Sequence, residues 1–277
     1  MRIELIVATY NSPGPLRLCL ASVAAQRLQP GSICIADDGS GPETAAAIAE
    51  IAAARPVPPI RHVWHEDRGF EKGAILNRAI ATSEADFLVF IDGDVLIHPG
   101  FIARHVAMAR PDRFSSGSLI RLDAEATAAV TVEDVVSGRV FERAWLRRMR
   151  AIDRFGTWLK TMPLPEPVMA LLDRATPVQR AWCGANASAF RAALLAVNGF
   201  DETMKYGGGD KELGVRLANS GVPGQHLRYT APLVHLEHPR GYADPEHKRA
   251  NKERVRAERR SGLVWTPHGI EKRARAS

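Results

Sequence analysis

The chain has 277 residues, of which 45% are hydrophobic and 25% charged, and it carries a formal net charge of +6. These proportions are typical of a globular protein, and they exclude the disordered, collagen-like and disulfide-scaffold classes. No apolar run approaches the roughly 20 residues that a membrane-spanning helix needs, and we do not expect the charged N-terminus to be a signal peptide. The three cysteines stand far apart without metal-ligand spacing, which favours a reduced, cytoplasmic location.

The positive charge gathers in two segments. Residues 246–277 contain ten Lys or Arg and four Asp or Glu, and residues 139–160 contain seven basic and two acidic residues. Such segments suit an anionic partner, either a phosphorylated substrate, a lipid surface or nucleic acid, and a solvated surface explains them equally well. Because no nucleic-acid recognition motif accompanies them, we expect no nucleic-acid partner. Peripheral contact with the inner face of the plasma membrane remains open for both segments.

The first 110 residues alternate between strand and helix patterns. Short apolar runs predict buried strands, and longer alanine-rich or amphipathic stretches predict helices between them. The expected strands are 3–8, 32–37, 60–65 and 86–92, and the expected helices are 16–26, 42–54 and 71–81. This order predicts an α/β fold with a Rossmann-like, mainly parallel sheet flanked by helices, whose ligands bind beyond the C-terminal ends of the strands.

The second half is less regular and predicts mixed structure. The expected elements are a strand over 114–120, an insertion with helical stretches over 121–180, mixed structure over 182–238 and a charged helix over 244–260. We treat residues 1–277 as a single domain. Its parts are a first half (1–110), a second half (111–243) and a basic C-terminal helix and tail (244–277).

Three polar motifs follow the expected strands. Asp92-Gly93-Asp94 is a D-x-D motif whose carboxylates can converge on a divalent cation, with Gly93 allowing a close turn. Asp37-Asp38-Gly39-Ser40 has the composition of a turn, although one carboxylate could accept hydrogen bonds from a nucleobase or ribose. In Thr9-Tyr10-Asn11, the aromatic ring offers a stacking face and its neighbours offer polar groups.

Together these motifs resemble a family-2 glycosyltransferase with the GT-A fold. The segments ATYNSP, IADDGS and FIDGD occur in the order and at the spacing of that family over residues 1–110. Further segments of the chain resemble family segments, the third of them in a galactosyltransferase-like pattern, and these are 66–80, 182–191, 199–217 and 235–239.

The resemblance implies a set of site residues. Those implied to bind the nucleotide sugar are Ala8, Thr9, Tyr10, Asn11, Asp38, Arg68, Gly69, Asn77, Asp92 and Gly93. Those implied near the acceptor and the transferred sugar are Trp182, Gly184, Asn186, Gly208, Gly209 and Glu212. The implied ligands of Mn²⁺ or Mg²⁺ are Asp92, Asp94 and His235, and the implied catalytic base is Asp210.

The resemblance also implies a metal-dependent, inverting glycosyltransferase. A nucleoside-diphosphate sugar, with UDP as the expected nucleotide, would donate a hexose to a glycan or lipid-linked acceptor of a bacterial surface polysaccharide. Gly209 departs from the family, because relatives carry Glu before the catalytic Asp. A donor-binding protein with little catalysis is therefore one alternative. A nucleotidyltransferase is another, although TYNSP stands where such enzymes carry a phosphate-binding loop.

Overall fold

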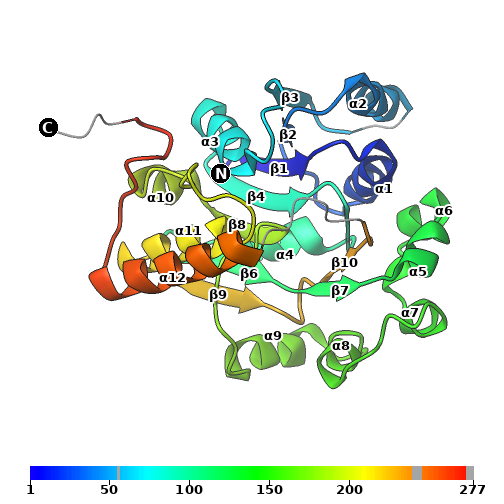
Figure 1. Cartoon of the computed structure of the whole chain (residues 1–277). Helices are drawn as coiled ribbons and strands as arrows, with labels where there is room; N and C mark the ends of the chain where they lie inside the picture. Colours follow the sequence, from blue (N-terminus) through cyan, green and yellow to red (C-terminus); the bar gives the residue numbers. More distant parts are fainter. Residues whose placement is uncertain (55–56, 239–244, 273–277) are drawn as a thin grey trace, which may run out of the picture.

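A seven-stranded sheet forms the centre of the protein (Figure 1). The computed structural model describes residues 1–54, 57–238 and 245–272. The strands of the sheet lie in the order β3 (Ile60–Trp64), β2 (Ser32–Asp37), β1 (Ile3–Thr9), β4 (Phe87–Asp92), β8 (Asn186–Phe190), β6 (Phe114–Gly117) and β9 (Gly224–Leu227). The first four strands of this order pair in parallel, and β8 runs antiparallel to both β4 and β6. The predicted mainly parallel sheet is thereby confirmed.

Helices cover both faces of this sheet. On one face lie α1 (Pro13–Ala24), α2 (Pro42–Ala54) and α4 (Phe101–Ala107), and on the other lie α3 (Lys72–Thr82), α10 (Arg191–Ala196) and α11 (Gly209–Asn219). In β1, Leu5 and Val7 pack into the first layer and Ile6 into the second, and all three are fully buried. Strands covered on both faces are apolar at every interior position, which is why the sequence pattern reveals them.

A second, three-stranded sheet joins the main one. Its order is β5 (Val95–Ile97), β10 (Leu233–His235) and β7 (Leu119–Arg121). The single strand expected over 114–120 is in fact two strands, β6 in the main sheet and β7 in the second. Since β4 ends at Asp92 and β5 starts at Val95, the D-x-D motif lies at the junction of the two sheets.

The insertion consists of short helices around this second sheet. They are α5 (Ala124–Ala128), α6 (Val132–Val136), the 3₁₀ helix η1 (Arg139–Phe141), α7 (Arg143–Arg148), α8 (Phe155–Lys160) and α9 (Glu166–Ala175). The basic segment 139–160 is therefore broken into three helices. Its apolar side chains Phe141, Trp145, Met149 and Ile152 pack against the second sheet. Trp145 is buried and the other three are partly buried, so packing accounts for these apolar side chains.

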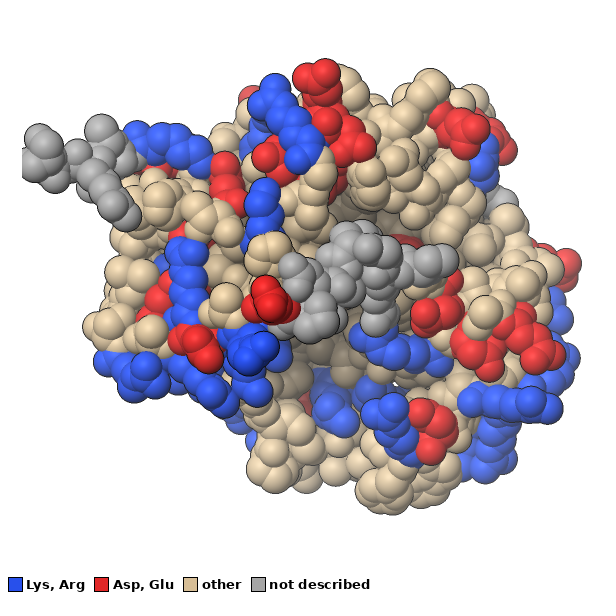
Figure 2. All heavy atoms as spheres, viewed as in Figure 1, with Lys and Arg blue, Asp and Glu red and all other residues tan. Residues whose placement is uncertain are grey.

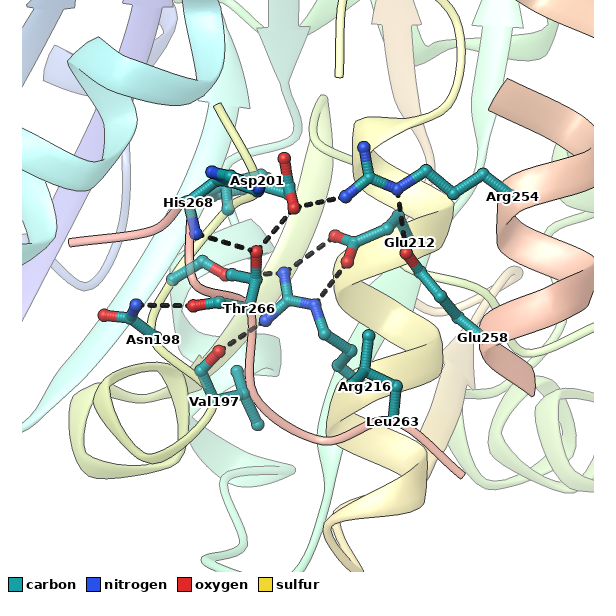
Figure 3. A network of polar contacts seen from close by, with 12 residues as sticks. Val197, Asn198, Asp201, Glu212, Arg216, Arg254, Glu258, Leu263, Thr266 and His268 are labelled. Carbon is teal, nitrogen blue, oxygen red and sulfur yellow. Dashed lines mark hydrogen bonds and ion pairs between the residues drawn. The ribbon is translucent and has the colours of Figure 1, made fainter. Parts of the chain in front are cut away.

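The last helix, α12 (Pro245–Ser261), packs against α11. The chain then crosses α11 and returns to Asn198, whose side chain donates to the Thr266 carbonyl at 2.7 Å and to the Glu271 carbonyl at 2.9 Å (Figure 3). None of the helices in the described ranges combines the length and hydrophobicity that crossing a bilayer requires. Pro239 of the predicted motif at 235–239, Asp244 and the tail residues 273–277 lie outside the described residues.

Candidate active site

A large cavity of about 1560 Å³ opens at the C-terminal ends of β1, β2 and β4. Its walls come from α3, α11, α12 and the second sheet. Many of the side chains expected at a site line this cavity, and these are Ala8, Thr9, Tyr10, Asn11, Asp38, Gly69, Asp92, Gly93, Asp94, Trp182, Gly208, Gly209, Asp210 and His235. Open α/β sheets bind their ligands at this edge, so the cavity is where the topology leads us to expect a site.

Asp94 and two histidines form a cluster in the cavity. The Asp94 Oδ2 atom lies 2.9 Å from His238 Nε2 and 3.9 Å from His235 Nε2, and ligand atoms of the three residues all lie within 4.8 Å of one another. Burial alone would raise the pKa of Asp94, but the hydrogen bond from His238 and the charge of both imidazoles hold it below its usual value.

These three residues fit a divalent transition metal. The Asp94 Oδ1 atom is buried and has no hydrogen-bond partner in the described part of the chain, so one oxygen of this carboxylate is available to a cation. One carboxylate and two imidazoles are donors that suit Mn²⁺ better than Mg²⁺, which prefers an all-oxygen shell.

Pairing between β5 and β10 creates the cluster. These two strands run antiparallel with His235 opposite Val95, and the Leu236 N–H donates to the Asp94 carbonyl at 2.9 Å. Two segments about 140 residues apart in the chain are thereby fixed side by side. The D-x-D turn alone would not provide this set of ligands.

Asp92 has a different partner from the one expected. Its Oδ1 atom lies 2.5 Å from the Lys72 ammonium on α3, and it does not belong to the cluster of Asp94 and the histidines. Burial alone would lower the pKa of Lys72, but the carboxylates of Asp92 and Asp210 raise it above its usual value. Asp92 forms an ion pair with Lys72 here, and its role as a metal ligand stays a prediction.

Asp210 stands in the first turn of α11 and faces the cavity. Its Oδ2 atom accepts a hydrogen bond of 3.0 Å from the backbone N–H of Gly184. A Cβ atom at Gly184 would lie 2.7 Å from Asp210 Oδ1, so only glycine allows this approach. The sequence led us to expect Gly184 in the lining of the cavity. In the structure it lies behind Asp210 and positions that side chain.

The wall near β1 and β2 carries the aromatic and acidic groups expected for a nucleotide. Tyr10 is 41% exposed, and its hydroxyl donates to Asp67 Oδ2 at 2.9 Å. The Asp38 carboxylate lies 2.9 Å from His65 Nε2 and accepts a 3.1 Å hydrogen bond from the Glu71 N–H. Burial raises the pKa of Asp38. The ring and this carboxylate are both within the cavity lining.

Sequence comparison now decides the family, because the profile of glycosyl transferase family 2 matches residues 4–175. The chain belongs to glycosyl transferase family 2. A curated relative, validoxylamine A glucosyltransferase of Streptomyces hygroscopicus subsp. limoneus, is 27% identical over 231 residues, which make up 80% of this chain and 49% of the relative. The hyaluronan synthase of Pasteurella multocida is 28% identical over 106 residues, covering 38% of this chain and 11% of the synthase. The chain thus spans about half or less of these relatives.

Solved glycosyltransferases share the fold. The mannosyltransferase PcManGT from Pyrobaculum calidifontis, in complex with GDP-Man and Mn²⁺, aligns with a TM-score of 0.57 at 19% identity over 87% of this chain and 58% of that one. The glucosyl-3-phosphoglycerate synthase of Mycobacterium tuberculosis, in complex with Mn²⁺ and UDP-glucose, aligns with a TM-score of 0.52 at 15% identity over 96% and 80%. At these identities the likeness establishes the GT-A fold for this family-2 chain.

Two asparagines expected in the site are instead buried structural residues. Asn77 exchanges hydrogen bonds with the backbone of Phe200 at 2.7 and 2.8 Å and ties α3 to the loop before α11. Asn186 on β8 is fully buried and donates to the carbonyls of Ser118 and Ala231. Neither side chain lines the cavity. Both bridge segments that are distant in the chain, which a sequence motif does not reveal.

Glu212 and Arg68 also lie away from the cavity. Glu212 is fully buried in α11 and forms an ion pair with Arg216, so it neither contacts an acceptor nor replaces the Glu that Gly209 lacks. Arg68 is exposed and lies 3.8 Å from Glu66. The cavity wall at this point is made by its neighbours Gly69 and Phe70.

Three features of the site went unrecognised in the sequence. Lys72 carries no motif that marks it as a partner of Asp92. His238 stands three residues after His235, and this spacing is a sequence signal for a second imidazole ligand. Finally, α12 lines the cavity with Lys252, Arg256 and Arg259, although the sequence indicated only a basic helix.

Proposed function

We propose that this chain is a metal-dependent, inverting glycosyltransferase that uses a nucleoside-diphosphate hexose, with UDP as the expected nucleotide. The observation that carries the proposal is that a candidate metal cluster and a positioned carboxylate share one cavity. Asp92, Asp94 and Asp210 all line this cavity, and their three carboxylates raise the pKa of the Lys72 ammonium. A donor bound there would meet both groups.

The donor occupies the half formed by residues 1–110. Tyr10 stacks on the base, and Asp38 accepts hydrogen bonds from the base or the ribose. Asp94, His235 and His238 hold the cation, which when bound supplies Lewis-acid stabilisation to the departing diphosphate. The complexes of related structures with Mn²⁺ and GDP-Man or UDP-glucose support this class of donor.

Asp210 acts on the acceptor from the half formed by residues 111–243. Its carboxylate, held by the Gly184 N–H, accepts the proton of the acceptor hydroxyl as the oxygen attacks the anomeric carbon. The sugar–phosphate bond breaks on the opposite side of that carbon. A single displacement of this kind inverts the anomeric configuration.

The missing Glu before Asp210 does not disturb this geometry. A Cβ atom at Gly209 would meet only Met204 Cβ at 3.6 Å, which is ordinary van der Waals contact. The glycine therefore leaves open space beside the base and does not displace it. This favours catalysis over the alternative of a protein that binds the donor without turning it over.

The proposed acceptor is a glycan or a lipid-linked glycan of a surface polysaccharide, modified on the cytoplasmic side. Phe155 on α8 is 74% exposed and Leu171 on α9 is 63% exposed, and exposed arginines of α7 lie close in sequence to the former. Apolar side chains flanked by cations suit an anionic membrane surface. Flotation with phosphatidylglycerol vesicles tests this contact, and failure to float with them would contradict it.

A panel of nucleotide sugars tests the proposed function. Purified protein is incubated with each donor and with cell-derived acceptors, in Mn²⁺ or in EDTA, and the released nucleoside diphosphate is measured. We expect release from one or two donors in Mn²⁺ and none in EDTA. Release of pyrophosphate instead would indicate a nucleotidyltransferase and overturn the proposal.

A further inference from the structure

A stripe of cations runs along the face of α12 that borders the cavity. Lys252, Arg256 and Arg259 follow one another at intervals of four and three residues, which places them on one face of the helix. Figure 2 shows the Lys and Arg side chains gathered over α12. Like charges at this spacing repel one another and weaken a helix. The three cations therefore reduce the stability of the helix, and packing alone does not explain why they are there.

The charges on the other face of α12 are paired. Arg254 lies 2.5 Å from Asp201 and 2.9 Å from Glu258 (Figure 3). By contrast, no carboxylate in the described part of the chain lies within ion-pair distance of Lys252, Arg256 or Arg259. The helix thus neutralises the charges on its buried side and leaves those beside the cavity unneutralised.

A side pocket of about 280 Å³ adjoins the main cavity at this stripe. Arg180, Lys211 and Arg259 line it, and the described residues of its wall include no Asp or Glu. Lys211 and Arg259 line both hollows, so the two lie next to each other. Lys211 directly follows Asp210, so the wall of the side pocket includes the neighbour of the proposed base.

The helix that carries these cations is fixed against α11. Asn219 of α11 donates to the Glu258 carbonyl at 3.2 Å and to the Leu263 carbonyl at 2.8 Å. Asn251 of α12 donates to the Lys205 carbonyl at 3.1 Å, in the loop that leads to Asp210. These bonds fix α12 against α11, so the stripe and the base form one preorganised unit.

From this arrangement, and resting on the proposed function, we infer that the acceptor carries a phosphate group. Arg256, Arg259, Arg180 and Lys211 bind that phosphate while Asp210 receives the proton of a nearby hydroxyl. Guanidinium forks match phosphate oxygens in pairs, and Lys adds a point charge. The phosphate belongs either to a soluble phosphorylated polyol or sugar, or to a lipid headgroup.

Calorimetry with sn-glycerol 3-phosphate, in Mn²⁺ and UDP, tests the soluble source, and unphosphorylated glycerol is the control ligand. Flotation with phosphatidylglycerol vesicles tests the lipid source. Arg256→Gln with Arg259→Gln removes two pocket cations. Arg249→Gln with Arg260→Gln removes two exposed cations of the same helix that line neither hollow, and this is the matched control.

We expect the wild type to bind at least one phosphate probe and to ignore glycerol. The pocket pair should lose at least about tenfold in affinity, whereas the control pair should stay within about twofold. Binding of sn-glycerol 3-phosphate would indicate a soluble phosphorylated acceptor, and binding to the vesicles would indicate a lipid headgroup. Equal losses in the two pairs, or no binding of either probe by the wild type, would overturn the inference.

Affinity for UDP with Mn²⁺, measured on the same samples, separates this inference from the proposed function. If UDP affinity falls in the pocket pair as much as phosphate affinity, the cations serve the donor and the inference is wrong, while the proposed function stands. Failure of the wild type to bind any nucleoside diphosphate with Mn²⁺ would instead overturn the proposed function.

Discussion

Three carboxylates near the ends of β4 and α11 have three different partners, and those partners decide what each can do. Asp92 is bound to Lys72, Asp94 faces two histidines and Asp210 is held by the backbone of Gly184. Asp92 is thereby neutralised, whereas Asp94 keeps a buried oxygen without a hydrogen-bond partner in the described part of the chain. This division underlies the proposal that Asp94 binds the cation and Asp210 accepts the proton.

Asp94→Asn should weaken Mn²⁺ binding by at least about tenfold, because the amide offers no negative charge to the cation. His238→Gln should weaken it as well, since one imidazole ligand is lost. Electron paramagnetic resonance of free Mn²⁺ measures both affinities. Asp92→Asn is the control and should change Mn²⁺ affinity far less. Unchanged affinity in Asp94→Asn would contradict the assigned cation site.

Asp210→Asn should cut sugar transfer by about 10²–10⁴-fold, the range that a general base contributes. Asn has nearly the shape of Asp, and its side-chain oxygen can still accept the bond from Gly184, so donor and Mn²⁺ affinities should be unchanged. Initial rates of transfer, measured beside donor binding, check this. Full activity in the variant would exclude Asp210 as the base.

For single residues, the sequence predicted well which segments lie near the cavity, but it predicted less well which side chains face it. Residues directly after strands, such as Tyr10 and Asp94, lie in the cavity because strand ends share one edge of the sheet. Asn77, Asn186 and Glu212 were also expected there, but their side chains point into the protein. A motif indicates which segment is near a ligand, and tertiary contacts decide which face of the segment the ligand meets.

At the level of helices and strands, polar contacts with neighbouring segments, the C-terminal one included, help to fix α11. A polar network joins α11, α12 and the strand-like segment after α12 (Figure 3). Within it, Glu212 and Arg216 are both fully buried, with a bond of 2.7 Å between Oε2 and a guanidinium nitrogen. Arg216 also donates to the carbonyls of Val197 and Gly199. The network thus links α11 to α12, to the segment after α12 and to the loop that contains Val197 and Gly199.

Arg216→Met should destabilise the protein by about 3–5 kcal/mol, because it leaves the Glu212 carboxylate buried without its partner. Adding Glu212→Leu removes that uncompensated charge, so the double variant should be more stable than Arg216→Met alone. Urea denaturation followed by circular dichroism measures both. A double variant that is less stable than the single variant would contradict this account of the pair.

His105 on α4 should make the fold sensitive to acid. It is fully buried between Ser188 and Asn186, and burial lowers its pKa to about 3 from the usual 6.5. Below pH 6.5, His105 therefore binds a proton in the unfolded chain but stays neutral in the folded protein. The free energy of unfolding falls as the pH falls. Between pH 7.5 and 5 the loss from this group is about 2 kcal/mol.

His105→Gln cannot take up that proton, so its stability should fall less steeply over the same pH range. Denaturation curves of the wild type and the variant at several pH values give the difference directly. Parallel pH profiles for the two proteins would show that His105 does not contribute.

Whole elements were predictable where hydrophobic periodicity is strong. Strands β1 to β4 and helices α1 to α3 lie within a few residues of the expected ranges. In β1, β2 and β4, burial on both sides gives uninterrupted apolar runs, whereas the edge strand β3 is only partly buried. The split of 114–120 into β6 and β7 was not predictable, since it depends on pairing with β9 and β10, which are distant in the chain. The insertion was predicted only as helical stretches.

For the whole molecule, the junction of the two sheets is the feature that brings the candidate site residues together. The main sheet supplies Asp92 and the nucleotide wall, and the second sheet supplies His235 beside Asp94. On the opposite side, α11 and α12 supply Asp210 and the cationic stripe. The central claim is that the donor diphosphate and the cation share the cavity between these parts.

Calorimetric titration of UDP with Mn²⁺ and with EDTA tests that claim most directly, with uridine as a control ligand that lacks phosphate and GDP as a comparison nucleotide. Because linkage between two ligands is typically 1–3 kcal/mol, Mn²⁺ should raise the affinity for UDP by about tenfold or more and leave that for uridine unchanged. Equal UDP affinity in Mn²⁺ and in EDTA would contradict a shared site for the diphosphate and the cation.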